Sequence, residues 1–218
     1  MKWRQYGRNG VLIEFAEKPD EWAYHKSRAI SEALALKPPA RLIEFVPGYT
    51  TVLLEFDLTG EPSLESLAAK AIDMLTRSAR NKITEGPVKS IPVTYDGPDL
   101  QQVAAHNRIT VEQAIAFHSG PVYKVHLLGF SPGFPYLGEL HHRLHTPRLA
   151  TPRPKVPAGS VAIGGHHTGI YSVDSPGGWN IIGRTETKIF DTGKAASANP
   201  EEAFFLKPGD CVRFVPVK

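Results

Sequence analysis

Two short proline-stiffened repeats carry the arginines whose type and spacing could bind an anion. Thr146-Pro147-Arg148 recurs five residues later as Thr151-Pro152-Arg153. Proline fixes its own φ and favours extended backbone in the residue before it, so each guanidinium is presented from stiff chain. A guanidinium fork binds a carboxylate or a phosphate through two hydrogen bonds. Arg148 and Arg153 are therefore a candidate anion clamp; a solvated surface loop is the alternative.

An aromatic segment, GFSPGFPYLG at residues 129–138, could form the wall of a ligand pocket. Its prolines stiffen the backbone and its glycines bend it, while Phe134 and Tyr136 supply flat apolar faces. The segment could equally be a packed corner of a β-barrel, and the residues alone do not decide between the two.

A second loop, DSPGGW at residues 174–179, offers polar groups beside another aromatic face. The hydroxyl of Ser175 and the consecutive N–H groups of Gly177 and Gly178 could hold an anion or an oxyanion next to Trp179. The alternative is a tight loop with the tryptophan in the core.

The histidines favour no metal site. His141, His142 and His145 lie close together in the sequence, as do His166 and His167, but there is no HExxH motif, and we interpret these side chains as surface histidines. The single cysteine excludes an internal disulfide and a multi-cysteine zinc site. His118, near the end of an expected helix, is the one proton-transfer candidate, or it only caps the last carbonyls.

Several chemistries lack their usual motifs. The sequence has no G-x-x-x-x-G-K-[ST] phosphate loop, no dinucleotide-binding glycine fingerprint and no G-x-S-x-G nucleophile elbow. We therefore expect no cofactor bound by this chain. The net charge of +3 over 218 residues is too small for a general nucleic-acid or polybasic membrane binder. The first residues lack a signal peptide, and no stretch resembles a membrane helix, so we expect a cytoplasmic protein.

The elements of the first 80 residues follow the order βαββα. An apolar run at 11–15 precedes a helical pattern that ends at residue 36, and β-rich runs at 41–46 and 51–56 flank a proline-glycine turn. Ser63 can cap a second amphipathic helix. This order predicts a small α+β sandwich with helices on one sheet face.

Strands dominate after a change of composition at residues 85–87, which divides the chain into expected domains of residues 1–86 and 87–218. Two short helices are expected, from Asp99 and from Thr110, the second with a capping box. Nine glycines and seven prolines punctuate residues 129–178, and the short β-rich runs between them predict a barrel or sandwich. Strands are expected at 122–128, 160–163, 169–173, 181–183, 188–190 and 211–215.

Four ordered blocks, GFSPGFPYLG, PRLATPRPKVPAGSVAI, TGIYSVDSPGGWNIIGRT and PGDCVRF, resemble the allophanate hydrolase subunit 1 family. The resemblance covers most of residues 88–215. It implies an α+β fold with an N-terminal ferredoxin-like α+β domain and a C-terminal cyclophilin-like β-barrel domain. Family members include the B subunit of the ATP-dependent 5-oxoprolinase complex and a sporulation kinase inhibitor.

The resemblance implies a protein that is inactive alone and belongs to a complex that opens 5-oxo-L-proline to L-glutamate. The expected partners are a second cyclophilin-like subunit, similar to the C subunit of 5-oxoprolinase, and a third catalytic subunit, with ATP used by the complex. Arg148 and Arg153 would neutralise the substrate carboxylate. Charge at the reacting centre would be stabilised by Ser160, Ser175, Gly177 and Gly178. The wall around the substrate ring would consist of Phe134, Tyr136 and Trp179. Proton transfer would fall to His118.

Two alternatives remain open from the sequence. The chain could be a carboxyltransferase-type subunit of a biotin-dependent urea or amide carboxylase, which would need a biotinylated partner. It could instead be a regulatory module that inhibits a sensor histidine kinase through a protein-binding patch around Phe130 and Phe134. The sequence also departs from the family at His166-His167 and Tyr171-Ser172, where substrate choice could differ.

Overall fold

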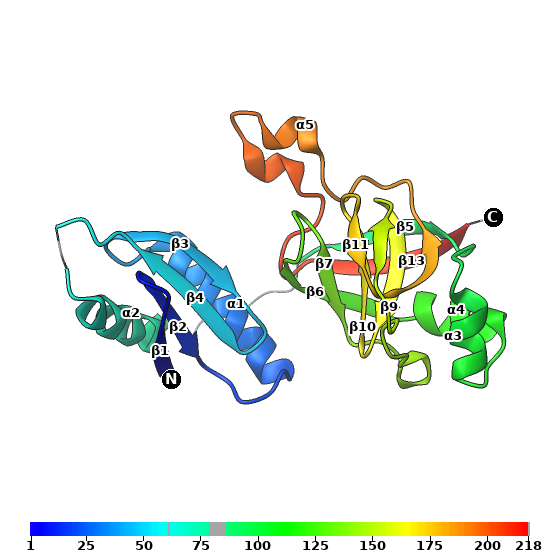
Figure 1. Ribbon diagram of the computed structural model, residues 1–218, viewed down its shortest axis with the longest axis horizontal. Coiled ribbons are helices and arrows are strands. Elements are labelled where there is room, and N and C mark those ends of the chain that lie inside the picture. The colour runs from blue at the N-terminus through cyan, green and yellow to red at the C-terminus, as the bar shows by residue number, and fades with distance from the viewer. Residues whose placement is uncertain (61, 79–85, 218) are drawn as a thin grey trace. The chain divides into compact units, whose positions relative to one another are not determined.

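The computed structural model describes residues 1–60, 62–78 and 86–217. The chain forms two compact units, residues 1–84 and 85–218 (Figure 1). The boundary expected at residues 85–87 begins at Glu85, which lies outside the described residues, and the division into domains 1–86 and 87–218 stays a proposal. Each unit has its own hydrophobic core.

The first unit is a four-stranded antiparallel sheet with two helices, in the strand order β1-β2-β4-β3. The βαββα order is confirmed for β2 onward, and one edge strand, β1, precedes it. All five residues of β1 are exposed, so no hydrophobic alternation marks this strand in the sequence. The elements are β1 (Lys2–Tyr6), β2 (Gly10–Glu14), α1 (Glu21–Leu36), β3 (Leu42–Pro47), β4 (Thr51–Phe56) and α2 (Leu64–Ser78).

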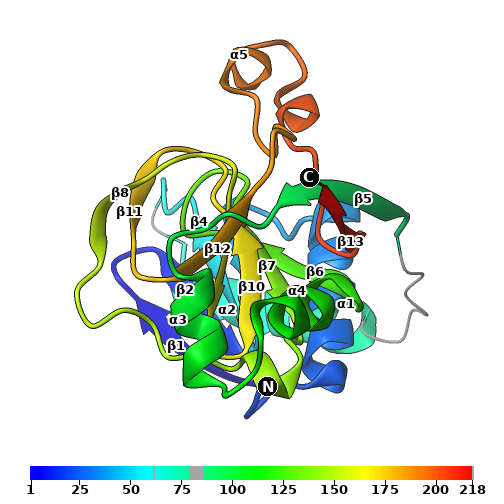
Figure 2. The same cartoon turned by 90° about the vertical axis from the view of Figure 1, so that its right-hand side faces the viewer.

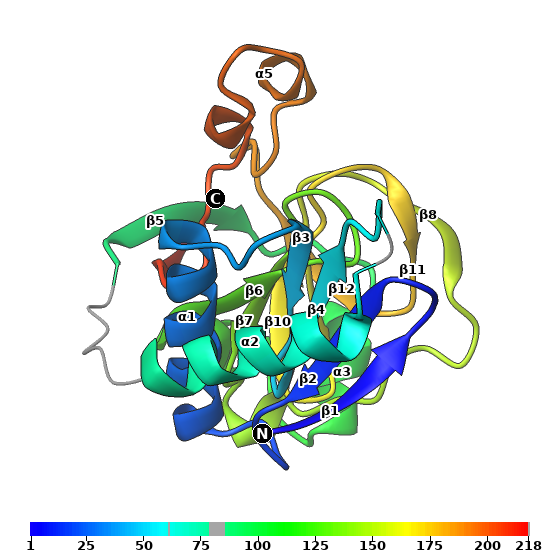
Figure 3. The same cartoon turned by 90° about the vertical axis from the view of Figure 1, so that its left-hand side faces the viewer.

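Both helices pack on one face of this sheet, as expected (Figure 3). The side chain of Asp20 caps α1 by accepting a hydrogen bond from the N–H of Ala23 at 2.8 Å. The inward residues of β2 and β4 alternate with outward ones and form a single core with the apolar stripes of the helices. The first unit therefore has the ferredoxin-like α+β arrangement that the resemblance implies.

The second unit is a closed seven-stranded barrel, in the order β10-β7-β6-β13-β5-β12-β9. The predicted barrel is therefore confirmed. Its strands pair antiparallel except for β5 and β13, which run parallel over seven residue pairs. The strands are β5 (Val88–Thr94), β6 (Val122–Leu128), β7 (Pro135–Gly138), β9 (Ser160–Gly164), β10 (His167–Ile170), β12 (Asn180–Arg184) and β13 (Cys211–Val217).

Short helices and a two-stranded ribbon lie on the outside of the barrel (Figure 2). Thr110 caps α4 with the expected capping box. The run 188–190, expected as a strand, is not one: Phe190 makes only an isolated bridge to Phe204, because the chain leaves the barrel there for a projecting helical excursion. The elements are α3 (Leu100–His106), α4 (Val111–Ser119), η1 (His142–Leu144), α5 (Thr192–Ala195), η2 (Pro200–Ala203) and a two-stranded ribbon of β8 (Arg153–Val156) and β11 (Ser175–Gly177).

Alternation along the barrel strands produces two apolar layers. On β9, Val161 and Ile163 point into the barrel core, whereas Ala162 points outward into a second cluster. We call this cluster the outer layer; it consists of Phe134, Val156, Ala162, Tyr171, Trp179 and Ile181, with Tyr136 packed against it. Most of the side chains predicted to bind a ligand belong to it or border it.

None of the helices in the described ranges is both long enough and apolar enough to cross a membrane.

Candidate functional site

Three rings of the outer layer lie directly over glycines. A Cβ at Gly164 would come within 2.8 Å of the Trp179 indole, and one at Gly169 within 2.9 Å of Cζ of Phe134. A Cβ at Gly177 would overlap the Tyr171 hydroxyl. Because these positions carry no side chain, the rings can pack against the backbone of the barrel wall and the ribbon.

The predicted aromatic wall is brought together around Phe134. Its ring lies edge to face with those of Tyr136, Tyr171 and Trp179, at centroid distances of 5.2, 5.3 and 5.5 Å. Phe130 packs against Phe134 at 5.5 Å but remains 62% exposed, with a left-handed φ of 70°. The wall is therefore a buried aromatic cluster, in which Phe134, Tyr171 and Trp179 are at most 5% exposed and Tyr136 is partly buried, with the exposed ring of Phe130 at its edge.

Arg148 stands over this surface. Its Cζ lies 5.7 Å from the centre of the Trp179 ring, and the residue is exposed. Two hydrogen bonds hold its loop in place: the Leu149 N–H donates to the Gly178 carbonyl at 2.7 Å, and Asn180 Nδ2 donates to the Pro147 carbonyl at 2.9 Å. The guanidinium is thus presented to solvent beside the aromatic faces.

Arg153 has a different environment from Arg148. Its Nη2 donates to Asp99 Oδ1 at 2.7 Å, while Asp99 Oδ2 accepts the Ile181 N–H at 2.7 Å. Its Nη1 is buried and has no hydrogen-bond partner in the described part of the chain. One terminal nitrogen of the guanidinium, Nη2, is therefore used by the ion pair with Asp99, and the other, Nη1, remains a hydrogen-bond donor without an acceptor among the described residues.

Both arginines lie near Tyr171. Burial raises the pKa of Tyr171, and the backbone N–H of Trp179 and the charges of Arg148 and Arg153 offset part of that rise. Burial also raises the pKa of Tyr136, whereas the positive charge of Arg148 lowers it by a smaller amount. The two phenols stay protonated at neutral pH and can donate hydrogen bonds.

The predicted serines and glycines lie around the same face. Ser160 begins β9 with the same outward direction as Ala162, and it is buried. Ser175 Oγ is buried without a hydrogen-bond partner among the described residues. Gly177 pairs with Arg153 in the ribbon. The carbonyl of Gly178 accepts from Leu149, and a role for the two glycine amides in binding an anion stays a prediction.

His118 is not brought together with the other candidates. It is fully buried in the barrel core, with Nδ1 2.7 Å from the Tyr95 hydroxyl and Nε2 2.8 Å from Thr168 Oγ1. Burial lowers the pKa of His118 to about 3. Its ring stacks on Phe214 at 4.5 Å. This geometry gives His118 a packing role inside the barrel.

Two other histidines, His126 and His167, lie on the outward face instead. His126 covers Gly138, where a Cβ would lie 2.8 Å from its Nε2. His167 stands opposite Gly138 on the other side of β7, because its neighbour Thr168 pairs with Leu137. Burial lowers the pKa of His126 to about 4, helped by the charges of His167 and Lys124. Tyr123 and Val125 point into the barrel core, so strand alternation alone places His126 on the outward face.

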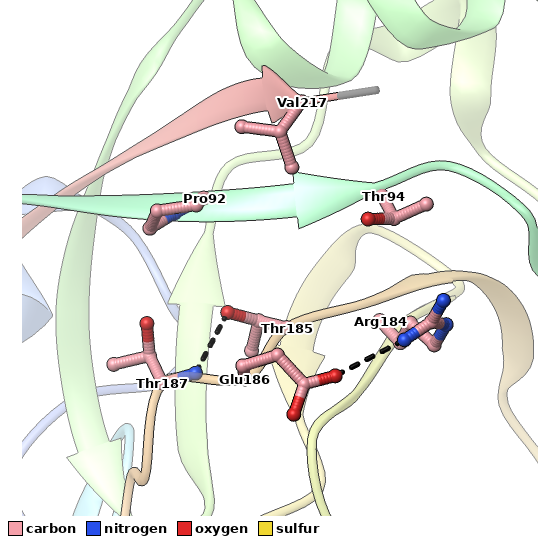
Figure 4. Close-up of a pocket in the computed structure, with 7 residues that line it drawn as sticks. All are labelled: Pro92, Thr94, Arg184, Thr185, Glu186, Thr187 and Val217. Atoms are coloured by element: carbon pink, nitrogen blue, oxygen red, sulfur yellow. Dashed lines mark hydrogen bonds and ion pairs between the residues drawn. The ribbon is translucent and has the colours of Figure 1, made fainter.

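Two open pockets lie elsewhere in the described residues. One, of about 300 Å³, is at the barrel rim, and its lining is shown in Figure 4. There Arg184 is engaged with Asp96 at 2.9 Å and Glu186 at 3.0 Å, so its charge is already neutralised. The other, of about 400 Å³, is in the first unit. Neither contains an outer-layer residue, and the convergence of aromatic and basic groups favours the outer layer as the site.

Comparison with known proteins identifies close relatives. The chain is 42% identical to the B subunit of 5-oxoprolinase from Escherichia coli O157:H7, over 97% of this chain and 94% of the relative. It is 34% identical to the B subunit of 5-oxoprolinase from Bacillus subtilis strain 168, over 98% and 91%. It is also 23% identical to urea amidolyase of Lachancea kluyveri, over 99% of this chain but 13% of that protein.

Solved structures share the fold. The crystal structure of TTHA0988 is 37% identical with a TM-score of 0.82; it matches 96% of this chain, which spans 40% of that one. PH0987 from Pyrococcus horikoshii is 36% identical with a TM-score of 0.56, over 100% of this chain and 98% of its own. The family described as "Carboxyltransferase domain, subdomain C and D" matches residues 1–199. The chain therefore belongs to the family of carboxyltransferase domains, subdomains C and D.

Proposed function

We propose that this chain is the B subunit of a multi-subunit 5-oxoprolinase that opens 5-oxo-L-proline to L-glutamate with ATP, and that it is inactive alone. The observation that carries the proposal is its 42% identity, over nearly the full length of both chains, to a protein named as the B subunit of 5-oxoprolinase. The cytoplasmic location expected from the sequence stays a prediction.

The outer layer suits the chemistry of this substrate, a small flat ring that carries one carboxylate. Arg148 is exposed and offers a fork to the carboxylate, beside the faces of Tyr136 and Trp179. Trp179 is only 5% exposed and lies under Arg148, so in this proposal the planar ring stacks on the partly buried Tyr136 while the carboxylate is held by the guanidinium. Phe134 keeps the two faces in place from below.

The groups with unmet hydrogen-bonding capacity favour a second contact. Arg153 Nη1 and Ser175 Oγ are both buried without partners among the described residues, a condition that costs free energy unless a ligand or water satisfies it. In this proposal they stabilise negative charge on the lactam oxygen or its phosphorylated form, with Ser160, Gly177 and Gly178 nearby. Arg153 is less available than Arg148 because Asp99 holds its other nitrogen.

The proposal assigns no proton transfer to His118, because both of its ring nitrogens are engaged inside the core. The imidazoles of His126 and His167 face outward instead. Burial lowers the pKa of His167 and keeps its ring neutral at neutral pH, as it does for His126. A neutral imidazole can accept a proton from an attacking water.

The partners in this proposal are a second cyclophilin-like subunit and a third catalytic subunit, with ATP bound outside this chain. Phe130 supports an interface at the site, because its large ring stays 62% exposed at the edge of the outer layer. A partner that covers Phe130 would enclose the exposed edge of the outer layer. The complete active site would then form only in the complex.

The test is ATP-dependent conversion of 5-oxoproline to glutamate by the purified chain and by the complex that it forms with its host partners. We expect activity only in the complex. A complex that assembles but leaves 5-oxoproline unchanged would refute the proposed function.

Variants of Arg148 test the site itself. In the active complex we expect Arg148→Ala to lower kcat/KM for 5-oxoproline about 100-fold, in line with the loss of a charge-assisted bidentate contact, and Arg148→Lys to restore only part of it. Arg143→Ala is the matched control, because Arg143 also lies over a ring, that of Phe117 at 5.6 Å, outside the outer layer. Equal activity in the Arg148 and Arg143 variants would remove Arg148 from the substrate site.

A carboxyltransferase role is the second candidate, favoured by the family match and by the similarity to urea amidolyase. It predicts a biotinylated protein among the partners and ATP-dependent carboxylation of urea by the complex. A biotin blot of the purified complex separates it from the 5-oxoprolinase proposal. Inhibition of a sensor histidine kinase stays a prediction from the sequence, tested by autophosphorylation with and without this chain.

A further inference from the structure

Two histidines outside the outer layer face each other across a backbone bridge. Thr146 and Gly165 form an isolated antiparallel bridge, which places His145 opposite His166. The Gly165 N–H donates to the Thr146 carbonyl at 2.8 Å, and the Leu140 N–H donates to the His166 carbonyl at 3.0 Å. The two segments are therefore fixed to each other by backbone hydrogen bonds on both sides of the histidine pair.

The two imidazoles meet through their Nδ1 atoms, which are 3.1 Å apart. The rings are nearly perpendicular, with centroids 4.3 Å apart. His145 Nε2 lies 3.0 Å from the Leu140 carbonyl, and a carbonyl oxygen can only accept, so this nitrogen carries the proton. In the neutral ring, Nδ1 of His145 then holds a lone pair that accepts a hydrogen bond from Nδ1–H of His166. Binding of a metal ion to both Nδ1 atoms requires the His166 proton to move to its Nε2.

From this arrangement the geometry points to a binding site for a divalent late transition metal ion, such as Ni²⁺, Cu²⁺ or Zn²⁺, held by Nδ1 of His145 and Nδ1 of His166. Metal-binding histidines usually donate their other N–H to a carbonyl or carboxylate, as His145 does to Leu140. Imidazole is a favoured ligand of these ions.

The separation of the nitrogens fits a shared ion. With metal–nitrogen bonds of about 2.0 to 2.1 Å, two ligands lie about 2.9 Å apart at a right angle and about 3.3 Å apart at a tetrahedral angle. The observed 3.1 Å falls between these values. Within the described residues no group of three or more His, Cys, Asp or Glu side chains is arranged to hold a metal ion, so water would complete the coordination sphere.

The site would couple to the outer layer through the chain itself. His166 directly precedes His167, which stands at the border of the outer layer. A bound ion would cross-link the segment of η1 to the turn between β9 and β10 and restrict the backbone that carries His167. The inference does not depend on the proposed 5-oxoprolinase function.

The experiment is a calorimetric titration of the complete, tag-free chain with Ni²⁺ at neutral pH. We expect one saturable site per chain. His166→Ala should weaken binding at least about tenfold, because it removes one of the two ligands. His142→Ala is the matched control, since His142 is exposed in the same segment and its ring stacks on His141 rather than on the pair.

A second readout distinguishes ligation from a structural effect. In electron paramagnetic resonance, Cu²⁺ bound to the wild type should show two nitrogen ligands, and the His145→Ala and His166→Ala variants should each lose one. His166 is exposed, so its variant should retain the wild-type circular dichroism. The inference is overturned if wild-type binding does not saturate below about 1 mM, or if His166→Ala binds Ni²⁺ as the His142→Ala control does.

Discussion

A glycine beneath an aromatic ring determines how closely that ring approaches the barrel wall. Trp179 lies over Gly164 and Phe134 lies over Gly169, so the position of each ring depends on a residue that has no side chain of its own. Interiors are packed densely enough that even one added methyl group is felt. The glycines of the outer layer are therefore part of the site's geometry.

Substitution of Gly164 tests this dependence. We expect Gly164→Ala to lower the free energy of unfolding by about 1 to 3 kcal/mol, because the new methyl group would overlap the Trp179 indole. Urea denaturation measures the change. The control is Gly193→Ala, where the atom nearest to a new Cβ is 3.3 Å away and belongs to the Asp191 side chain. Equal stability of the two variants would contradict the packing argument.

His118 predicts a pH dependence of stability. Burial holds its pKa at about 3 in the folded protein, whereas the unfolded chain takes up a proton near the ordinary pKa of 6.5. The stabilisation is fully present above pH 6.5 and is lost as the pH falls toward 3, because the unfolded state binds the extra proton.

The measurement compares wild type with His118→Gln by urea denaturation at several pH values. The wild type should lose up to about 1.4 kcal/mol more per pH unit than the variant in this window. Carboxylates and the remaining histidines titrate in both proteins and cancel in the difference. If the stability of the two proteins changed with pH in parallel, the pKa of His118 would not be lowered by folding.

The sequence predicts the clustering of the aromatic residues better than the surroundings of the arginines, and the role of both in binding stays a prediction. Phe134, Tyr136 and Trp179 were selected for their flat faces, and the structure does place them together. Arg148 and Arg153 looked equivalent in the two repeats, but Asp99, 54 residues before Arg153, pairs with only one of them. Contacts between distant segments are invisible to local spacing, which is why the different states of the two arginines were not foreseen.

At the scale of elements, Asp99 joins three of them. It stands at the N-terminus of α3 but makes no side-chain cap there. Its carboxylate instead accepts from Arg153 of β8 and from the backbone N–H of Ile181 in β12. The ribbon, the barrel and the helix are thus held together by a single carboxylate that is 7% exposed.

Neutralising this carboxylate should be costly. We expect Asp99→Asn to lower the free energy of unfolding by about 2 to 4 kcal/mol, since it leaves the Arg153 charge without its partner. The value lies toward the lower part of the range for buried pairs because the Arg153 side chain keeps 29% exposure. Thermal and urea denaturation measure the change.

The exposed pair of Asp96 and Arg184 provides the comparison for this prediction. Their side chains are 47% and 56% exposed, and Asp96→Asn should change stability by less than about 1 kcal/mol. A similar loss in both variants would mean that the burial of Asp99 does not determine its contribution.

Elements with strong periodicity were predictable, and those defined by pairing were not. The helix that Asp20 begins and the capping box of Thr110 could be identified from residue types alone. The edge strand β1 could not, because all of its residues are exposed and its existence depends on pairing with β2. The bulge between Val125 and Leu127 likewise arises from the register of β6 and β7.

At the scale of the whole molecule, the hydrophobic cores of the two units are separate. One core belongs to residues of the first unit, and the other clusters belong to the barrel and its outer layer. Gly86 belongs with the barrel, because its N–H donates to the Gly209 carbonyl at 2.9 Å. We therefore propose that each unit folds by itself and that a fragment should retain Gly86 with the second unit.

Separate production of residues 1–84 and 85–218 tests this proposal. We expect both fragments to unfold cooperatively, and the second to keep the near-ultraviolet circular dichroism of its buried Tyr and Trp side chains. A fragment beginning at residue 88, which lacks Gly86, should be less stable. Loss of cooperative unfolding in both longer fragments would show that the units depend on each other.

The parallel pairing of β5 with β13 has a consequence for synthesis. These strands are the first and the last of the barrel in chain order, and they align over seven pairs from Val88↔Cys211 to Thr94↔Val217. During translation, β5 leaves the ribosome long before its neighbour exists, so its edge stays unpaired until the whole barrel sequence has been made. A nascent chain stalled before residue 211 should therefore remain sensitive to protease throughout the barrel, whereas the first unit should already be protected.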